Sequence, residues 1–230
     1  MPTYKSKTML AVDVLRERIV AGEISPGERF DVRKIAAEME MSITPIREAL
    51  RILQADGLVS YDEHRSISAM KLQPDDAEEL YRLRAVVEGL ATELAIQHLD
   101  DDGRQAIVAA HEDMKQAAAA GDVDRATLAN RRWHFAVYGA GRSKFVEPVI
   151  ERLWARYLWS TIYSIPGRLQ ASVSEHQEIT DAIVAGQAKQ AARLMRTHIL
   201  AGLKSLDSHR REVERSEAKP RRARKADPRS

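Results

Sequence analysis

The sequence of 230 residues contains no cysteine, so disulfide bonds and thiolate metal sites are excluded. No stretch approaches the ~18 consecutive apolar residues that a membrane-spanning helix requires. The first twenty residues also lack the long apolar run of a secretory signal. We therefore expect a protein of the cytoplasm with no membrane partner.

The most informative pattern lies in residues 29–57, which predict two short helices joined by a tight turn and ended by a glycine. Apolar residues recur at helical spacing in both helices: Ile35, Ala36, Met39 and Met41 in the first, Ile46, Ala49, Leu50 and Leu53 in the second. Between them, Ser42 and Thr44 offer hydroxyls to cap the second helix, and Pro45 suits its first turn. Arg47 and Arg51 follow on the polar face. Hydroxyls for phosphate and guanidinium groups for guanine edges are what a helix needs to enter the major groove, so the pattern predicts a DNA-binding helix-turn-helix.

Residues 18–72 resemble the winged-helix domain of the GntR family of bacterial transcription regulators. The matching positions are Ile19, Gly22, Ile24 to Glu28, Ile35, Ala36, Ser42, Thr44 to Leu50, Leu53, and Gly57 to Val59. The resemblance implies DNA contacts from Ser42, Ile43, Thr44, Pro45, Arg47 and Arg51, and from His64, Arg65 and Ser66 in the wing. Arg33 is a further candidate, because its charge could contribute to a basic DNA face. Two of these depart from the family pattern, because Ile43 replaces an arginine and Ser66 replaces a glycine. The operator sequence therefore cannot be copied from relatives. The alternative is an ordinary helical hairpin, which the number of matched positions disfavours.

The distribution of charge supports DNA binding only indirectly. Residues 1–72 contain eleven basic and eleven acidic residues, so a basic face must arise from how charges are sorted in space. Residues 210–230 contain nine basic and four acidic residues and almost no apolar ones. We expect this segment to be a disordered basic tail, and a DNA-binding arm is the alternative.

The coarse pattern predicts a mainly α protein with two domains. An N-terminal winged helix-turn-helix, residues 1–72, contains a first helix at 8–21 and two short strands of a β wing at 57–61 and 66–71. Helical periodicity then dominates residues 73–209, in the segments 75–98, 101–120, 122–139, 143–163, 168–185 and 187–208. Short connections between long helices predict an antiparallel all-α bundle.

This second part resembles the FCD domain, the effector-binding and dimerisation domain of the FadR subfamily of GntR proteins. The resemblance is found in Leu80 to Glu88, Trp133 to Phe135, Glu175 to Ile179, Ala182, Ile183, Ala192, Met195 and His198. It implies a homodimer that reads a pseudo-palindromic operator in double-stranded DNA. It also implies control by a small carboxylate effector, with repression relieved by that effector as the commoner pattern and activation as the other.

Three of the seven histidines lie on apolar faces of predicted bundle helices. Asn130 and His134 are one turn apart on one helix, and His176 and His198 lie on the last two helices. His98, His111 and His209 are expected near helix ends or in polar surroundings. From the residues alone, hydrogen-bonded core histidines and metal ligands remain alternatives. The resemblance implies a divalent metal, with zinc or nickel expected, held by Asn130, His134, His176 and His198. The family usually has aspartate at position 130, so asparagine predicts weaker metal binding and a stronger pull on an anion.

Arg84 is the candidate effector-binding residue. It lies one turn before Glu88, which predicts either a surface ion pair or, by the resemblance, a guanidinium that holds a carboxylate in the cavity. Helical phase alone does not place four further candidates for the cavity wall, which are Arg132, Tyr138, Trp154 and Tyr163. Two other functions remain open at this point. One is a metal-dependent hydrolase that uses the Asn/His centre. The other is a regulator with structural histidines and an apolar, lipid-like ligand.

Overall fold

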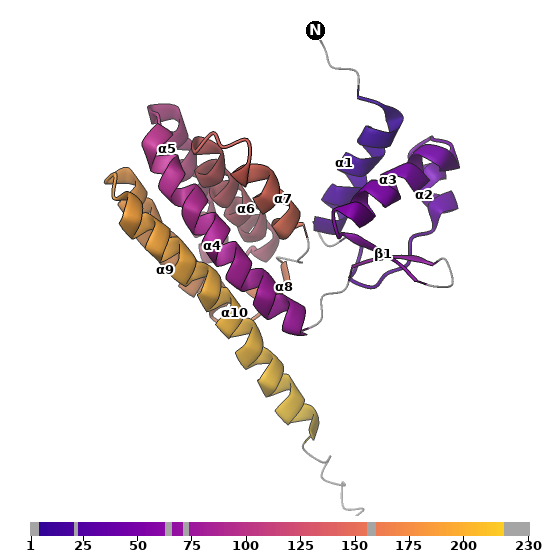
Figure 1. Cartoon of the computed structure of the whole chain (residues 1–230). Coiled ribbons are helices and arrows are strands. Elements are labelled where there is room, and N and C mark those ends of the chain that lie inside the picture. Colours follow the sequence, from indigo (N-terminus) through magenta and orange to yellow (C-terminus); the bar gives the residue numbers. More distant parts are fainter. Residues whose placement is uncertain (1–4, 21–22, 63–65, 71–73, 156–159, 219–230) are drawn as a thin grey trace, which may run out of the picture.

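The computed structural model describes residues 5–20, 23–62, 66–70, 74–155 and 160–218, and shows a small N-terminal unit beside a helical bundle (Figure 1). The N-terminal elements are α1 (Lys7–Val20), α2 (Val32–Glu38), α3 (Ile43–Ala55), β1 (Val59–Tyr61) and β2 (Ile67–Ala69). The bundle consists of α4 (Pro74–His98), α5 (Asp101–Ala120), α6 (Val123–Ala140), α7 (Val146–Trp154), α8 (Ser160–Tyr163), α9 (Arg168–Val184) and α10 (Ala188–Ala218). The predicted architecture, a winged helix-turn-helix followed by an all-α bundle, is confirmed.

The N-terminal unit is a helix-turn-helix with a two-stranded wing. Ile46, Leu50 and Leu53 on α3 are fully buried in one apolar cluster with α1, α2 and the strands. The carboxylate of Asp31 accepts the first free N–H groups of α2. Gly57 ends α3 with a φ of 75°, a conformation that favours glycine. The strands are antiparallel and turn back into the same cluster.

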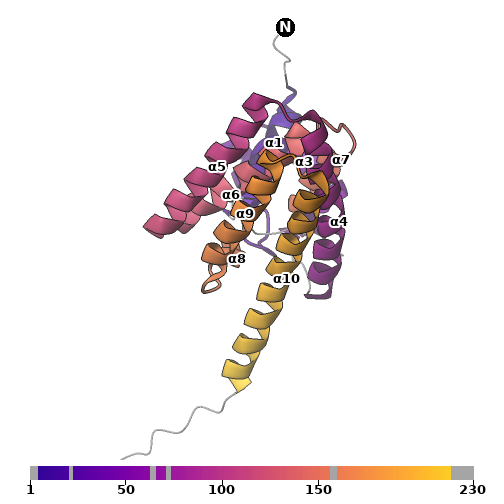
Figure 2. The same ribbon diagram turned by 90° about the vertical axis from the view of Figure 1, so that its left-hand side faces the viewer.

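The bundle is built on two main helix pairs, α4 with α10 and α5 with α6, and α9 packs between α5 and α10. Figures 1 and 2 show the C-terminal half of α10 projecting beyond the other bundle helices. The main core cluster includes Trp133, Trp154 and Met195, all nearly or fully buried. Within the described ranges, no helix combines the length and the apolar composition that crossing a bilayer demands.

The single helix predicted for 143–163 is wrong. The structure has two helices, α7 ending at Trp154 and α8 beginning at Ser160. Trp154 and Tyr163 line the same cavity. On a continuous helix, nine residues span about two and a half turns, which would place these two side chains on opposite faces. The interruption therefore brings both aromatic rings to one site.

The last helix is longer than predicted, because α10 continues to Ala218 and includes part of the segment expected to be disordered. Residues 210–216 are exposed, so packing does not hold this part in place. Its arginine and glutamate residues have good intrinsic helix propensity and simply extend the preceding turns. The rest of the predicted tail, residues 219–230, lies outside the described residues.

Candidate DNA face and metal-effector site

The exposed face of α3 contains the predicted DNA-binding residues. Thr44, Arg47 and Arg51 are exposed at positions i, i+3 and i+7, opposite the buried side of the helix. Ser42 and Ile43 are also exposed at the start of α3, Pro45 is half-buried, and Arg33 is exposed on α2. The amino end of α3 and this row of polar side chains therefore point away from the core.

Two details of the DNA face differ from the prediction. Ser42 precedes α3, but its side chain makes no capping hydrogen bond, so the predicted capping role is wrong. This helix end is exposed, so water can satisfy its N–H groups, which also remain free for a phosphate. In the wing, the Ser66 hydroxyl donates to Asp62 at 2.6 Å. His64 and Arg65 lie outside the described residues.

The three predicted metal-ligating histidines converge from three helices. His134 on α6, His176 on α9 and His198 on α10 are buried, and their candidate ligand atoms lie within 4.8 Å of one another. We call these three residues the histidine cluster. Asn130, one turn before His134, is 5% exposed and lines the adjoining cavity.

In each histidine of the cluster, Nδ1 contacts a hydrogen-bond acceptor. Nδ1 of His176 lies 3.1 Å from the thioether sulfur of Met114, which has no proton to donate. Nδ1 of His198 lies 2.6 Å from a carboxylate oxygen of Glu175. Nδ1 of His134 lies 2.7 Å from the Tyr138 hydroxyl, and that hydroxyl donates its own proton to Glu88. We therefore assign the proton to Nδ1 in all three rings, which leaves the lone pair on Nε2.

The Nε2 atoms of two of these histidines have the separation expected of two ligands to one ion. Nε2 of His134 and Nε2 of His176 are 3.2 Å apart. With metal–nitrogen bonds of about 2.0–2.1 Å, tetrahedral ligands lie about 3.3 Å apart and ligands at right angles about 2.9 Å apart. Two lone pairs at this distance repel each other unless a cation lies between them. The residues present therefore fit a divalent metal.

A proton is a poor substitute for that cation near neutral pH. Burial lowers the pKa of His134 and of His176 well below the ordinary 6.5, and repulsion from nearby basic side chains lowers both further. Burial also lowers the pKa of His198, although Glu175 partly offsets the effect. The three imidazoles are thus neutral and keep their lone pairs.

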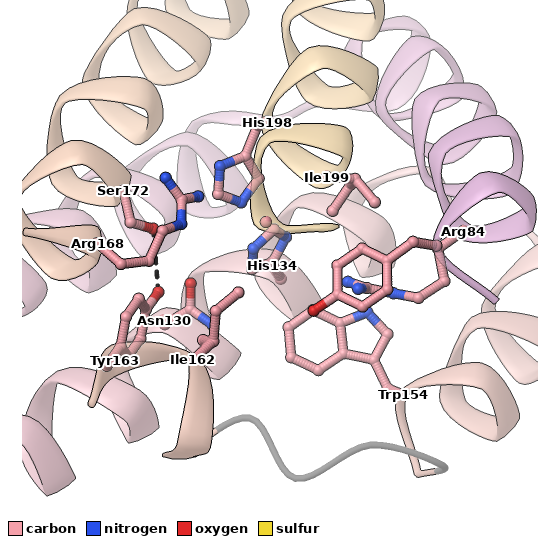
Figure 3. A pocket seen from close by; sticks show the side chains of 12 residues that line it. Arg84, Asn130, His134, Trp154, Ile162, Tyr163, Arg168, Ser172, His198 and Ile199 are labelled. Carbon is pink, nitrogen blue, oxygen red and sulfur yellow. Dashed lines mark hydrogen bonds between the residues drawn. The ribbon is translucent and has the colours of Figure 1, made fainter. Parts of the chain in front are cut away.

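Beside the histidine cluster lies a small cavity of about 30 Å³ (Figure 3). Its polar lining includes Arg84, Asn130, His134, Arg168, Ser172 and His198. Arg84 lies at one side of the histidines in this view and Arg168 at the other. The cavity has room for about one or two waters.

Arg84 forms the predicted pair with Glu88, but the pair is not at the surface. The Arg84 and Glu88 side chains are 2% and 0% exposed, and Nε of the arginine donates to the carboxylate at 2.6 Å. Glu88 also accepts hydrogen bonds from Trp154, at 3.1 Å, and from Tyr138. The surface alternative is therefore wrong, and Arg84 enters the cavity wall with a fixed orientation.

The four other candidates for the cavity wall differ in where the structure places them. Trp154 and Tyr163 line the cavity, and Tyr138 lies behind His134. Arg132 is 61% exposed and pairs with Asp113 instead. His111, expected in polar surroundings, is buried, and its Nε2 lies 3.2 Å from the Val173 carbonyl oxygen.

Two functional candidates, Arg168 and the carboxylate of Glu175, were not predicted as site residues. Both terminal nitrogens of Arg168 donate to Glu175, at 2.8 and 2.6 Å, and Glu175 in turn accepts from His198. Burial alone would raise the pKa of Glu175, but the hydrogen bonds from His198 and Arg168 outweigh it and hold that pKa at about 2. The sequence did contain one indication of this pair: Arg168 and Glu175 are seven residues apart on the helix that contains His176, so they lie on the same face.

Comparison with known protein families identifies both units of the fold. Residues 10–68 match the model described as bacterial regulatory proteins, gntR family, and residues 79–201 match the FCD domain. These matches cover the helix-turn-helix unit and most of the bundle. The protein is therefore a DNA-binding transcription regulator with a helical FCD domain, and it belongs to the GntR family.

Particular relatives share this organisation. The chain is 28% identical over 190 residues to the HTH-type transcriptional regulator YdhC of Bacillus subtilis (strain 168), covering 81% of this chain and 83% of the relative. It is 26% identical to the transcriptional repressor GlaR of Escherichia coli (strain K12), covering 81% and 89%. The solved structure of E. coli McbR/YncC has the same fold, with a TM-score of 0.81 at 22% identity, covering 90% of this chain and all of that one.

These relatives decide one of the alternatives. The family and the named relatives are transcription regulators rather than enzymes, so this protein is a regulator and the hydrolase alternative is excluded.

Proposed function

We propose that the protein is a homodimeric repressor whose affinity for its operator is controlled by a small carboxylate bound beside a divalent metal in the bundle. The observation that carries this proposal is the histidine cluster, with three buried imidazoles whose candidate ligand atoms lie within 4.8 Å of one another. Asn130 is the proposed fourth ligand. Zinc or nickel is the expected ion, and when bound it would supply positive charge that attracts an anion.

Charge around the cluster supports an anionic effector. Arg84 is balanced by Glu88 in a buried pair, and Arg168 by Glu175 in a partly buried pair, so the two ion pairs leave no excess charge. The ligand side chains themselves, three imidazoles and one amide, are neutral. A divalent ion in this site would therefore keep its full charge until an anion joined it.

The cavity supports a small polar effector over a lipid-like one. Its wall contains two arginines, an asparagine and a serine, which suit a polar ligand. Arg84, held by Glu88, is the proposed carboxylate-binding residue.

The end of α7 supports communication between the cavity and the DNA-binding unit. Trp154 lines the cavity, and the next residue, Ala155, is buried in the apolar cluster of the helix-turn-helix. Nε of Arg152, two residues before Trp154, lies 3.4 Å from a carboxylate oxygen of Asp56, the residue that caps the C-terminal end of α3. A shift of Trp154 on effector binding would therefore reach the recognition helix directly. Such coupling requires that effector affinity differ between the free and DNA-bound forms.

Dimer formation is supported by apolar side chains that the single chain leaves exposed. Leu83, Val86 and Leu90 form an exposed row on α4, with 43–62% of each residue exposed. Phe145 and Val149 are exposed on the neighbouring α7 segment. We propose that a second copy covers this row, so that two α3 helices with Thr44 to Arg51 read the two halves of a pseudo-palindrome.

Selection of binding sites from random double-stranded DNA tests the proposal, when it is repeated with Zn²⁺ and a panel of small organic acids. The expected result is one palindromic motif whose recovery falls with a particular acid, and only when metal is present. Recovery of a motif that no acid affects, or that a chelator leaves equally responsive, would contradict the metal-effector part. The DNA-binding function would stand.

A further inference from the structure

The second helix of the helix-turn-helix begins with an isoleucine that lies outside the core. Ile43 is the first residue of α3 and is 42% exposed, whereas Ile46 and Leu50 further along the helix are fully buried. Among the described residues, Met41 packs against the apolar cluster of this unit, but Ile43 does not belong to that cluster. Packing of the core therefore does not account for an apolar side chain at position 43.

Ile43 lies at the end of α3 that meets DNA. In a helix-turn-helix, the N-terminal residues of the second helix contact base edges in the major groove. At about 100° per residue, Ile43 is about 40° around the helix from Arg47 and about 80° from Arg51. Both arginines are exposed, as are Ser42 and Thr44 on either side of Ile43. The isoleucine therefore belongs to the surface that faces the bases.

An isoleucine side chain suits only one of the base edges in this groove. It has neither a donor nor an acceptor, so it cannot form hydrogen bonds with guanine, adenine or cytosine. Thymine alone presents an apolar group there, its C5-methyl. A guanine or cytosine placed against Ile43 would lose water from a polar group without gaining a hydrogen bond, which disfavours both bases.

We propose that Ile43 is a specificity-determining residue that reads thymine through its C5-methyl group. Each operator half-site then has an A·T pair where the first residue of α3 enters the groove. This inference rests on the proposed function, namely that two α3 helices read the two halves of a pseudo-palindrome. What it adds is the identity of one base pair and the atom by which it is recognised.

Replacement of thymine by deoxyuridine tests the contact, because deoxyuridine keeps the base pairing and the O4 acceptor and lacks only the methyl group. The operator is first selected from random DNA with the full-length wild-type protein. Each thymine of the half-site is then replaced in turn, and binding is followed by fluorescence anisotropy at one salt concentration. At one position, near the expected start of α3, the replacement should weaken binding about three- to fivefold per half-site, the factor for one methyl-sized apolar contact.

Three variants assign this contact to a side chain. Ile43→Ala should bind the thymine and deoxyuridine operators within about twofold of each other, because the shorter side chain withdraws from the methyl group. Ile43→Arg should select guanine at the same position, because a guanidinium can donate to both O6 and N7 of guanine. Ile52→Ala is the matched control, since Ile52 is 37% exposed on the same helix but lies about 180° around it from Ile43. This control should keep the full thymine preference.

The outcomes separate the contact from operator binding as a whole. A selected operator in which no thymine methyl affects wild-type binding overturns the role of Ile43 and leaves operator recognition in place. A methyl effect that persists in Ile43→Ala assigns the contact to another side chain, such as Thr44, and also overturns it. So does an Ile43→Arg variant that selects the wild-type motif unchanged. Failure to select any motif overturns the inference together with the operator reading on which it rests.

Discussion

Replacing Glu88 by alanine should destabilise the helical bundle strongly. The change would remove the carboxylate that pairs with the buried Arg84 guanidinium and accepts hydrogen bonds from Trp154 and Tyr138. Breaking a buried ion pair by removing one partner costs about 3–5 kcal/mol. For a chain of this size each kcal/mol lowers the melting temperature by about 2–4 °C, so we expect a fall of about 6–20 °C. Urea and thermal unfolding of the metal-free protein, followed by circular dichroism, measure the loss.

The same helix provides a matched control. Glu78 and Arg82 are also four residues apart on α4, with an N–O distance of 2.7 Å, but their side chains are 54% and 72% exposed. Exposed pairs contribute about 0.2–1 kcal/mol, so Glu78→Ala should shift the transition by little. If both substitutions cost the same, then the Arg84–Glu88 pair is not the buried, desolvated contact described above, and the orientation of Arg84 in the cavity is in doubt.

Four further changes test the other parts of the account. Asn130→Asp should tighten Zn²⁺ binding and weaken propionate binding, because it adds a negative charge beside the ion; isothermal titration in which neither affinity changes contradicts this. Tyr138→Phe removes an acceptor behind a metal ligand and should weaken Zn²⁺ binding about 10–100-fold in chelator competition, whereas an unchanged dissociation constant would show that the hydroxyl has no such role. Arg152→Ala should reduce the effect of the effector on DNA affinity by up to about fivefold, since a pair with one exposed partner contributes at most about 1 kcal/mol; an undiminished response would remove α7 from the coupling. Arg47→Ala should weaken oligonucleotide binding and lower the salt dependence by about one ion if the arginine contacts phosphate; anisotropy curves that overlay the wild type would contradict a place for α3 in the groove.

Local patterns in the sequence predicted the fold well, because the helices of a helix-turn-helix and of a bundle can be predicted from the spacing of apolar residues within each helix. The apolar face of α3, with Ile46, Leu50 and Leu53, is buried as predicted. The same reasoning missed the break after Trp154, since no glycine lies between α7 and α8 and Pro148 comes too early to cause it. That break follows from tertiary packing, where Ala155 joins the core of the other unit.

The candidate site was predictable only where the resemblance supplied it or one helix contained it. Asn130 and His134 share a helix face, so their proximity follows from sequence. The surroundings that give the histidines their chemistry come from distant segments: Met114 reaches His176 from α5, and Glu88 on α4 is linked to His134 through a tyrosine. The sequence could not decide whether Arg84 forms a surface ion pair or lines the cavity, because the i, i+4 spacing is identical for an exposed and a buried pair. Its burial in the structure decides this question. Such long-range contacts leave no periodic signature in a single sequence.

Metal analysis of protein purified without an affinity tag is the most direct test of the histidine cluster. We expect about one zinc or nickel ion per chain in the wild type. His176→Gln should lose the ion, and His98→Gln, an exposed histidine on α4, should retain it. Wild-type protein that neither contains nor takes up a divalent metal would contradict the central claim, and so would full occupancy in a folded His176→Gln variant.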